Sequence, residues 1–204
     1  VADVTSTMDL STAGLEVEES VAVGGLRVIN LTTGRDEIVW NALEHIPIEE
    51  RNPLRFDPWS IVGGGRDWLH FNTVSITTDN NYILSSPNLS TIYLIDGIDG
   101  NVLWRLGGDQ SDFQFLDESD RFYFQHTPSM LPNGNIVLFD NGGDESLGEM
   151  RPIEFGSYSR GLELELNMAN MTATKVWEYR HDPDHISPTI SGVQRLENGN
   201  TLVN

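Results

Sequence analysis

A single histidine precedes a tight turn within residues 125–142, and its imidazole is the first candidate for chemistry. His126 is followed by the turn residues Pro-Asn-Gly at 132–134, where Asn-Gly accepts the positive φ that a tight turn requires. We therefore predict a strand at 135–139 and a hairpin that presents His126 to a cavity. The alternative interpretation is a histidine with satisfied hydrogen bonds at a strand end, because short motifs often match by chance.

His70 takes a similar place at the entry of an earlier segment, and Arg160 begins a later strand. In a protein built of repeated sheets around a channel, equivalent positions face the same channel. We therefore predict that His70, His126 and an arginine converge on one cavity. Two imidazoles and a guanidinium suit a tetrahedral oxyanion, because arginine offers forked donors to two oxygens.

Two further patterns favour structural interpretations. His181 and His185 lie in a Pro- and Asp-rich loop, where solvated side chains are the expected state. The acidic segments 96–101 and 140–144 could be read as calcium loops. Neither has the alternating ligand spacing of such a loop, and both are good hairpin turns.

The composition excludes several classes of function. The 31 acidic and 12 basic residues give a net charge of −19, and Lys175 is the only lysine. Nucleic acids and anionic membranes would be repelled by such a surface. There is no cysteine, no apolar run of membrane-spanning length and no signal-peptide pattern, and we expect no cofactor and no metal. Three sequons would accept N-glycans in a glycosylating source, at Asn30, Asn88 and Asn170.

Short β-branched and aromatic runs alternate with turn residues along most of the chain, which predicts an all-β fold of antiparallel sheet. Residues 1–20 are expected to form an N-terminal linker or edge strand, and residues 21–204 a partial β-propeller domain. The strands are predicted at 26–30, 37–40, 72–77, 82–86, 91–96, 101–106, 135–139, 162–167, 175–179 and in 193–203.

The predicted units repeat. LPNGNIV at 131–137 matches LENGNTL at 196–202, and a hydrophobic-Trp pair closes each unit at Trp40, Trp104 and Trp177. Four strands per unit favour a β-propeller with about three to four blades in this chain. The tryptophans are expected to pack between blades. Because so few blades cannot close a ring, and the sequence stops inside an expected strand, we expect a longer protein.

Several motifs together resemble the arylsulfate sulfotransferase (arylsulfotransferase) family from about Trp68 to the C-terminus, in the family's order. They are DWLHFNTV at 67–74, STIY at 90–93, VLWRLGG at 102–108, QHT at 125–127, FDNG at 139–142, SRGLEL at 159–164 and VWEY at 176–179.

The resemblance implies a six-bladed propeller with its active site in the channel. It also implies transfer of a sulfuryl group from an aryl sulfate to a phenolic acceptor through a sulfohistidine intermediate. By motif, His70 and His126 match the family's two supporting histidines, and the arginine is either Arg160 or Arg151. The nucleophilic histidine is expected beyond Asn204, so the 204-residue chain alone is not expected to turn over aryl sulfates.

The competing interpretation is a non-catalytic extracellular propeller that acts as a binding module or as an assembled, filament-like scaffold. High acidity and three sequons suit it equally well, and a homo-oligomer or assembly stays open in both cases. A quinone-cofactor propeller shares only the fold. Either main interpretation predicts an extracellular or periplasmic protein without membrane insertion.

Overall fold

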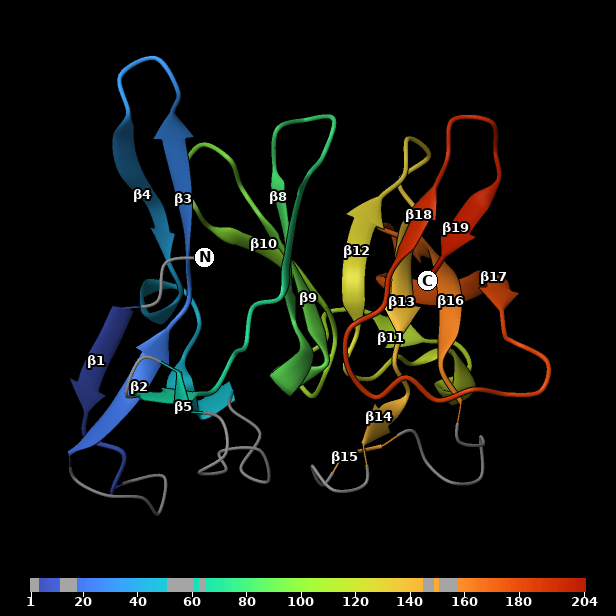
Figure 1. Ribbon diagram of the computed structural model, residues 1–204, viewed down its shortest axis with the longest axis horizontal. Helices are drawn as coiled ribbons and strands as arrows, with labels where there is room; N and C mark the ends of the chain where they lie inside the picture. Colours follow the sequence, from blue (N-terminus) through green and yellow to red (C-terminus); the bar gives the residue numbers. More distant parts are fainter. Residues whose placement is uncertain (1–3, 12–17, 51–60, 63–64, 145–148, 151–157) are drawn as a thin grey trace. The chain divides into compact units, whose positions relative to one another are not determined.

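The computed structural model describes residues 4–11, 18–50, 61–62, 65–144, 149–150 and 158–204 (Figure 1). These residues form strands joined by turns and 3-10 helices of three residues, and none of them is α-helical. The all-β class predicted from the sequence is therefore confirmed. In this part of the chain there is no helix with the length and apolar character needed to cross a membrane.

The chain divides into two compact units, Val1–Phe71 and Asn72–Asn204. The first unit contains a four-stranded sheet in the order β1-β2-β6-β5 and a separate hairpin of β3 and β4. β1 lies at the sheet edge, and β2 spans the boundary expected at residue 20. The elements are β1 (Val4–Met8), β2 (Glu19–Val23), β3 (Gly25–Asn30), β4 (Arg35–Asn41), η2 (Ala42–Glu44), η3 (Ile48–Glu50), β5 (Ile61–Val62) and β6 (Gly65–Asp67).

The second unit begins with an antiparallel sheet whose four strands follow one another in sequence order, β7 to β10. Its strands contain many β-branched and aromatic residues, and both β8 and β9 are mostly buried. The elements are β7 (Thr73–Ile76), β8 (Tyr82–Ser86), η5 (Pro87–Leu89), β9 (Thr91–Ile95) and β10 (Val102–Gly107).

The next sheet has the order β11-β17-β16-β13-β12. Its first strand in the chain, β11, pairs in parallel with β17, so a segment that follows β10 adds to the far edge of the next sheet. β14 pairs with β15 and β18 with β19 in two further two-stranded sheets. The remaining elements of the unit are β11 (Gln114–Phe115), η6 (Glu118–Asp120), β12 (His126–Met130), β13 (Ile136–Asp140), β14 (Gly143–Asp144), β15 (Glu149–Met150), β16 (Arg160–Asn167), β17 (Thr172–Tyr179), β18 (Val193–Arg195) and β19 (Thr201–Val203).

One apolar core fills the space between these two sheets of the second unit. It is built from buried side chains of both, with Trp104 and Phe113 in an edge-to-face contact at 5.6 Å between ring centroids. Its buried members are Ile83, Ile92, Leu94, Trp104, Leu106, Phe113, Phe115, Phe122, Ile136, Leu138, Leu162, Leu164 and Ala173.

The three repeated tryptophans occupy the same local structure. In each of the three hairpins the residue directly before the tryptophan is skipped in the strand register, as expected of a β-bulge. The skipped residues are Val39, Leu103 and Val176. The hydrophobic-Trp pair is therefore a bulge followed by an inward-facing ring, although Trp177 is only partly buried whereas Trp40 and Trp104 are buried.

The repeated Asn-Gly segments also form the same turn. Gly134 donates to Leu131 O and Gly199 to Leu196 O, each at 2.9 Å, with φ values of 87° and 85°. A third turn of this kind joins β7 to β8, where Asn80 donates to Thr77 O at 3.1 Å. These three turns fix the register of the repeats.

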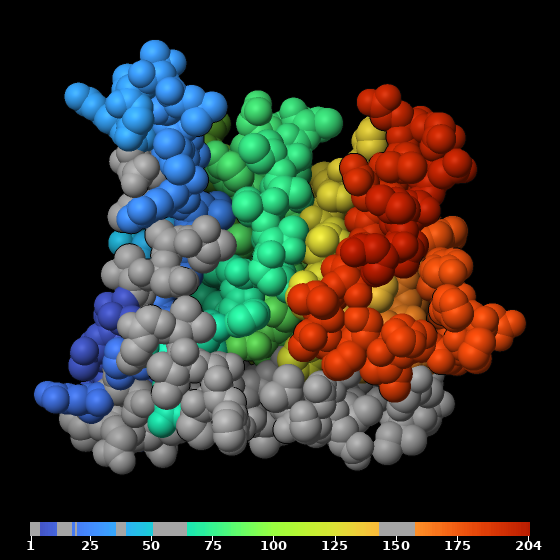
Figure 2. Space-filling view, viewed as in Figure 1, coloured from blue at the N-terminus to red at the C-terminus, as the bar shows by residue number. Residues whose placement is uncertain are grey.

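In the second unit, hydrogen bonds link β7, β12 and β18, and Figure 2 shows their segments side by side, from green through yellow to red. Thr127 N donates to Thr73 Oγ1 at 3.1 Å, and Val193 N donates to Thr127 Oγ1 at 2.9 Å. One threonine hydroxyl thus joins each strand to the next. No sheet among the described residues closes on itself.

Candidate active site

His126 is the first residue of β12 and lies opposite Phe139 of β13. Its backbone neighbours are unusual, because Phe124 and Thr127 have φ values of 56° and 51°, in a region that residues other than glycine rarely adopt. Its imidazole is half-buried. The backbone is therefore irregular on both sides of His126, and the strand register shifts between His126 and Ser129.

Nδ1 of the His126 ring contacts two oxygens. Asn141 Oδ1 lies at 2.9 Å and Phe124 O at 3.0 Å. Nε2 has no hydrogen-bond partner among the described residues. The Nδ1 edge of the ring is thus held by the protein, and Nε2 is the nitrogen that can bind a ligand.

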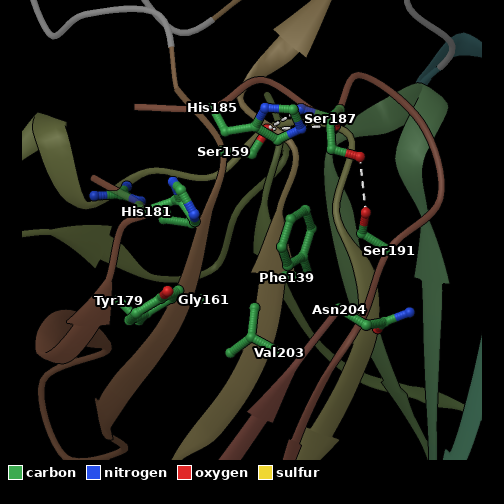
Figure 3. Close-up of a pocket in the computed structure, with 11 residues that line it drawn as sticks. Phe139, Ser159, Gly161, Tyr179, His181, His185, Ser187, Ser191, Val203 and Asn204 are labelled. Carbon is green, nitrogen blue, oxygen red and sulfur yellow. Dashed lines mark hydrogen bonds between the residues drawn. The ribbon is translucent and has the colours of Figure 1, made fainter. Parts of the chain in front are cut away.

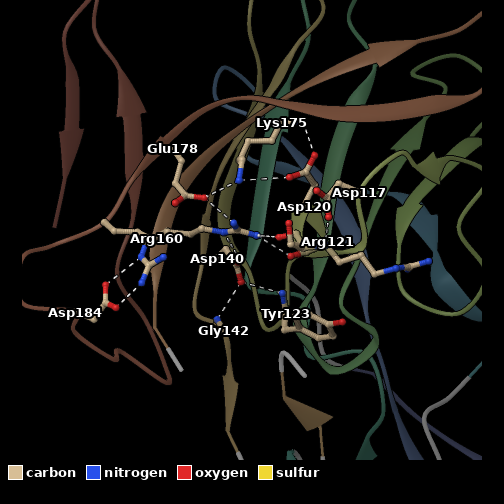
Figure 4. A network of polar contacts seen from close by, with 12 residues as sticks. Asp117, Asp120, Arg121, Tyr123, Asp140, Gly142, Arg160, Lys175, Glu178 and Asp184 are labelled. Carbon is tan, nitrogen blue, oxygen red and sulfur yellow. Dashed lines mark hydrogen bonds and ion pairs between the residues drawn. The ribbon is translucent and has the colours of Figure 1, made fainter. Parts of the chain in front are cut away.

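Asp140, the residue before Asn141, is completely buried and holds the chain in place (Figure 4). Its Oδ2 accepts a hydrogen bond from Arg160 Nε at 2.8 Å. Its Oδ1 accepts from the backbone N–H groups of Tyr123 at 3.0 Å and Gly142 at 2.9 Å. The carboxylate therefore ties the end of β13 to the chain just before His126.

Ser159 and Arg160 bind two consecutive residues, Asp140 at the end of β13 and Asn141 directly after it. Ser159 Oγ donates to Asn141 O at 2.7 Å, while Arg160 pairs with Asp140. Ser159 Oγ also accepts from Ser187 N at 2.8 Å. The motifs FDNG at 139–142 and SRG at 159–161 are consequently two halves of one hydrogen-bonded structure.

The guanidinium of Arg160 is inaccessible to solvent and is largely used by the protein. Nη1 donates to Glu178 Oε2 at 2.7 Å, and Nη2 donates to the carbonyls of Ser119 and Arg121 at 2.9 Å each. Burial alone would lower the pKa of Arg160, but the carboxylates of Asp140 and Glu178 raise it above its ordinary value. With four N–H groups engaged, this arginine is built to hold β13 and β17 together.

The pKa of Glu178, the partner of Arg160, shifts in the opposite direction. Burial would raise its pKa, but hydrogen bonds from Arg160 and Lys175 lower it below 4.5, the ordinary value. Lys175 Nζ lies 3.1 Å from Glu178 Oε2 and 3.4 Å from Asp120 Oδ1. The only lysine of the chain thus extends the buried network rather than offering a cation to a ligand.

His70 lies in the first unit, whereas His126 lies in the second, and each is described within its own unit. His70 has a φ of 50°, and its backbone N–H donates to Asp67 Oδ1 at 2.8 Å. Nδ1 of its ring contacts the other oxygen of the same carboxylate. Nδ1 of His70 is therefore held by the protein, as is Nδ1 of His126.

The register of the repeats pairs His126 with a different residue from the one predicted. Asn72 and His126 each lie five residues before their turns at Thr77 and Leu131, and Asn72 N donates to Ser85 O at 3.2 Å. His70 is two residues out of this register. The equivalence of repeats alone therefore does not bring the two histidines together, and their convergence stays a prediction. Arg151 lies outside the described residues.

A pocket of about 210 Å³ lies beside this structure in the second unit (Figure 3). Its wall includes Phe139, Tyr179 and Ser187, together with His181 and His185. The rings of the two histidines lie 6.5 Å apart, and His181 Nδ1 contacts Pro183 O at 2.9 Å. Both histidines are exposed, as the loop composition predicts, but they border a concave surface that the sequence did not indicate.

The remaining candidate positions lie at a strand end, in a 3-10 helix or in turns. Asn30 and Asn170 are exposed, whereas Asn88 is half-buried in η5. The sequons at Asn30 and Asn170 are therefore the accessible ones. Asp96 Oδ1 accepts from the N–H groups of Ile98 at 2.7 Å and Asp99 at 3.2 Å, which is a hairpin turn stabilised by its own side chain. No cluster of three metal-ligating side chains occurs within the part of the chain that the structure describes.

Sequence reasoning missed two residues of this site, Asn141 and Ser159. Both lie in motifs that it singled out, but their roles depend on hydrogen bonds to segments 15 or more residues away. The only available signal was their position beside Asp140 and Arg160.

Comparison with known proteins agrees with the resemblance noted in the sequence. A family model described as "Arylsulfotransferase (ASST)" matches residues 11–204. The chain is 27% identical over 175 residues to the arylsulfate sulfotransferase AssT of Escherichia coli O6:H1, with 69% of this chain and 28% of the relative covered. It is 24% identical over 174 residues to AssT of Lelliottia amnigena, with the same coverage. The chain thus spans 28% of the length of these curated relatives.

Proposed function

Because the chain belongs to the arylsulfotransferase family, we propose that it is part of an enzyme that moves a sulfuryl group from an aryl sulfate to a phenolic acceptor. The observation that carries this proposal is the half-buried His126, whose Nδ1 is held by Asn141 and Phe124 and whose Nε2 remains for a ligand. An imidazole fixed at one nitrogen is suited to hydrogen bonding and proton transfer at the other.

The proposed reaction has two displacements. A histidine nitrogen attacks sulfur, the N–S bond forms, the S–O bond to the aryl group breaks, and the phenol leaves with a proton. The acceptor phenol then attacks sulfur, loses its proton to a base, and releases the histidine. We assign to His126 Nε2 the support of this exchange: when the ring is protonated, Nε2 donates a hydrogen bond to a sulfuryl oxygen or gives its proton to the leaving oxygen, and the lone pair of the neutral ring then takes the proton of the acceptor phenol. The predicted partner in this task is His70.

The role of the arginine divides between two residues. The contacts of Arg160 with Asp140, Glu178 and two carbonyls favour a positioning role for this arginine. We therefore propose Arg151 as the arginine that meets the sulfuryl group, since the resemblance offers only these two candidates.

We further propose that the sheets are blades of a six-bladed propeller. Support comes from two consecutive antiparallel sheets that share a core, and from the hydroxyl links between their first strands. Such an enzyme would act outside the cytoplasm, in the periplasm or extracellularly, where a net charge of −19 suits a soluble protein.

The test is turnover of a chromogenic aryl sulfate with a phenol acceptor by the full-length protein. We expect His126→Ala to lower kcat by about 10²-fold or more, the cost of one lost donor to a developing oxyanion. The matched control is His45→Ala, because His45 lies in the first unit, stacked on Trp40 at 5.3 Å. No turnover by the wild-type protein would instead favour the non-catalytic scaffold, and unchanged turnover by His126→Ala would exclude the role given to that residue.

A further inference from the structure

Asn141 has only one orientation that satisfies its hydrogen bonds. Its Nδ2 donates to the carbonyl oxygens of Ser187 at 2.7 Å and Ile190 at 2.8 Å. A carbonyl oxygen can only accept, so the amide nitrogen must face this loop and the amide oxygen must face His126. The side chain is completely buried, and a reversed amide would place its oxygen against the carbonyl oxygens of Ser187 and Ile190.

That orientation determines the proton on the His126 ring. Asn141 Oδ1 and Phe124 O are both acceptors, and both lie within 3.0 Å of Nδ1. Nδ1 must therefore carry a hydrogen, and in the neutral ring Nε2 holds the lone pair. The loop at residues 187–190 thus sets the chemistry of His126 through Asn141.

The backbone on both sides supports this interpretation independently. Two of the three carbonyls in this arrangement belong to Phe124 and Ile190, and each of these residues has a φ of 56°. Ser191, which follows Ile190, has a φ of 76°. Residues other than glycine rarely adopt this region, and such strain concentrates where a structure must aim a group. Neither carbonyl is part of a regular strand.

We propose that Asn141 is a positioning residue that keeps His126 in the Nδ1–H tautomer, so that Nε2 is the nitrogen presented to the substrate. The inference rests on the proposed function for its catalytic meaning, but the tautomer is a property of the folded protein alone. The loop that carries Ser187 and Ile190 holds the Asn141 amide in this orientation.

The experiment is a long-range ¹H–¹⁵N spectrum of full-length protein labelled at histidine nitrogens, with His126 assigned from its absence in His126→Gln. For the neutral ring we expect a protonated Nδ1 and an unprotonated Nε2 in the wild type. Asn141→Leu removes one of the two acceptors and leaves Phe124 O, so the Nδ1–H form should be less strongly favoured and the shifts of both nitrogens should move toward averaged values. Asn141→Asp keeps an oxygen beside Nδ1 and should keep the protonated Nδ1. The control Asn135→Ala loses a hydrogen bond to Glu163 on the same sheet and should leave the His126 pattern unchanged.

Kinetics give the second measurement. Asn141→Leu should lower kcat about tenfold, the fold-change for one lost neutral hydrogen bond, with little change in KM, and Asn141→Asp should recover part of it. An unprotonated Nδ1 in the neutral wild-type ring, or an unchanged ring pattern in a folded Asn141→Leu, would overturn the inference. If Asn141→Leu does not fold, the wild-type and Asn141→Asp spectra decide. A protein with the expected tautomer but no turnover would refute the proposed function while leaving the tautomer assignment intact.

Discussion

Arg160 Nε lies 2.8 Å from Asp140 Oδ2, and neither side chain is accessible to solvent. The pair joins the first residue of β16 to the last residue of β13, two strands that are neighbours in the sheet. Because Asp140 also holds Tyr123 and Gly142, this ion pair fixes the chain on both sides of the His126–Asn141 contact. Arg160 and His126 therefore belong to one connected hydrogen-bond network, through Asp140 and Asn141.

Removal of the guanidinium should destabilise the protein strongly. Arg160→Met leaves the Asp140 carboxylate buried without a cation, which typically costs about 3–5 kcal/mol of the free energy of unfolding. Urea unfolding of the full-length protein measures it. The control is Arg180→Ala, which removes an exposed ion pair with Asp184 and should cost about 1 kcal/mol or less. Equal losses in the two variants would contradict the structural role of Arg160.

Glu178 should make stability depend on acid pH. Its folded-state pKa is lowered, so its ionised form stabilises the protein fully above its ordinary value of 4.5, and this contribution is lost as the pH falls through the lowered pKa. We expect the unfolding free energy to decrease below about pH 4.5 and this decrease to be smaller in Glu178→Gln. A series of urea titrations from pH 7 to pH 3 tests it. Parallel curves for the wild type and Glu178→Gln would rule out this assignment.

Two glycines with similar φ separate backbone strain from crowding. Gly134 has a φ of 87° and open space where a Cβ would lie, so Gly134→Ala should cost about 1–2 kcal/mol from the left-handed backbone alone. Gly107 has a φ of 83°, and its added Cβ would lie 2.5 Å from both Phe122 Cζ and Ser90 O. Gly107→Ala should therefore cost clearly more. Thermal unfolding of both variants gives the comparison, and equal costs would refute it.

Much of the fold was predictable because local signals determine it. The runs at 82–86 and 91–95 are strands, and the Asn-Gly segments at 133–134 and 198–199 form the predicted turns. The short parallel pair of β11 with β17 was not predicted, since its two residues pair with a strand far along the chain.

The site was predictable only in part, for the same reason. The sequence pointed to His126 and Arg160, but not to the amide of Asn141 or the hydroxyl of Ser159, whose roles arise from contacts across the sheet. It also placed His70 in register with His126, whereas the turn geometry gives that position to Asn72. An offset of two residues in a repeat is invisible until the hydrogen bonds of its turns are known.

The central claim is that His126 supports sulfuryl transfer without carrying the sulfuryl group. Its most direct test is to incubate the full-length protein with an aryl sulfate in the absence of acceptor and to locate the covalent adduct by peptide mass spectrometry. We predict a sulfuryl group on one histidine other than His70 and His126, and a smaller amount of that adduct at early times in His126→Ala. A sulfuryl group on His126 itself would contradict the claim.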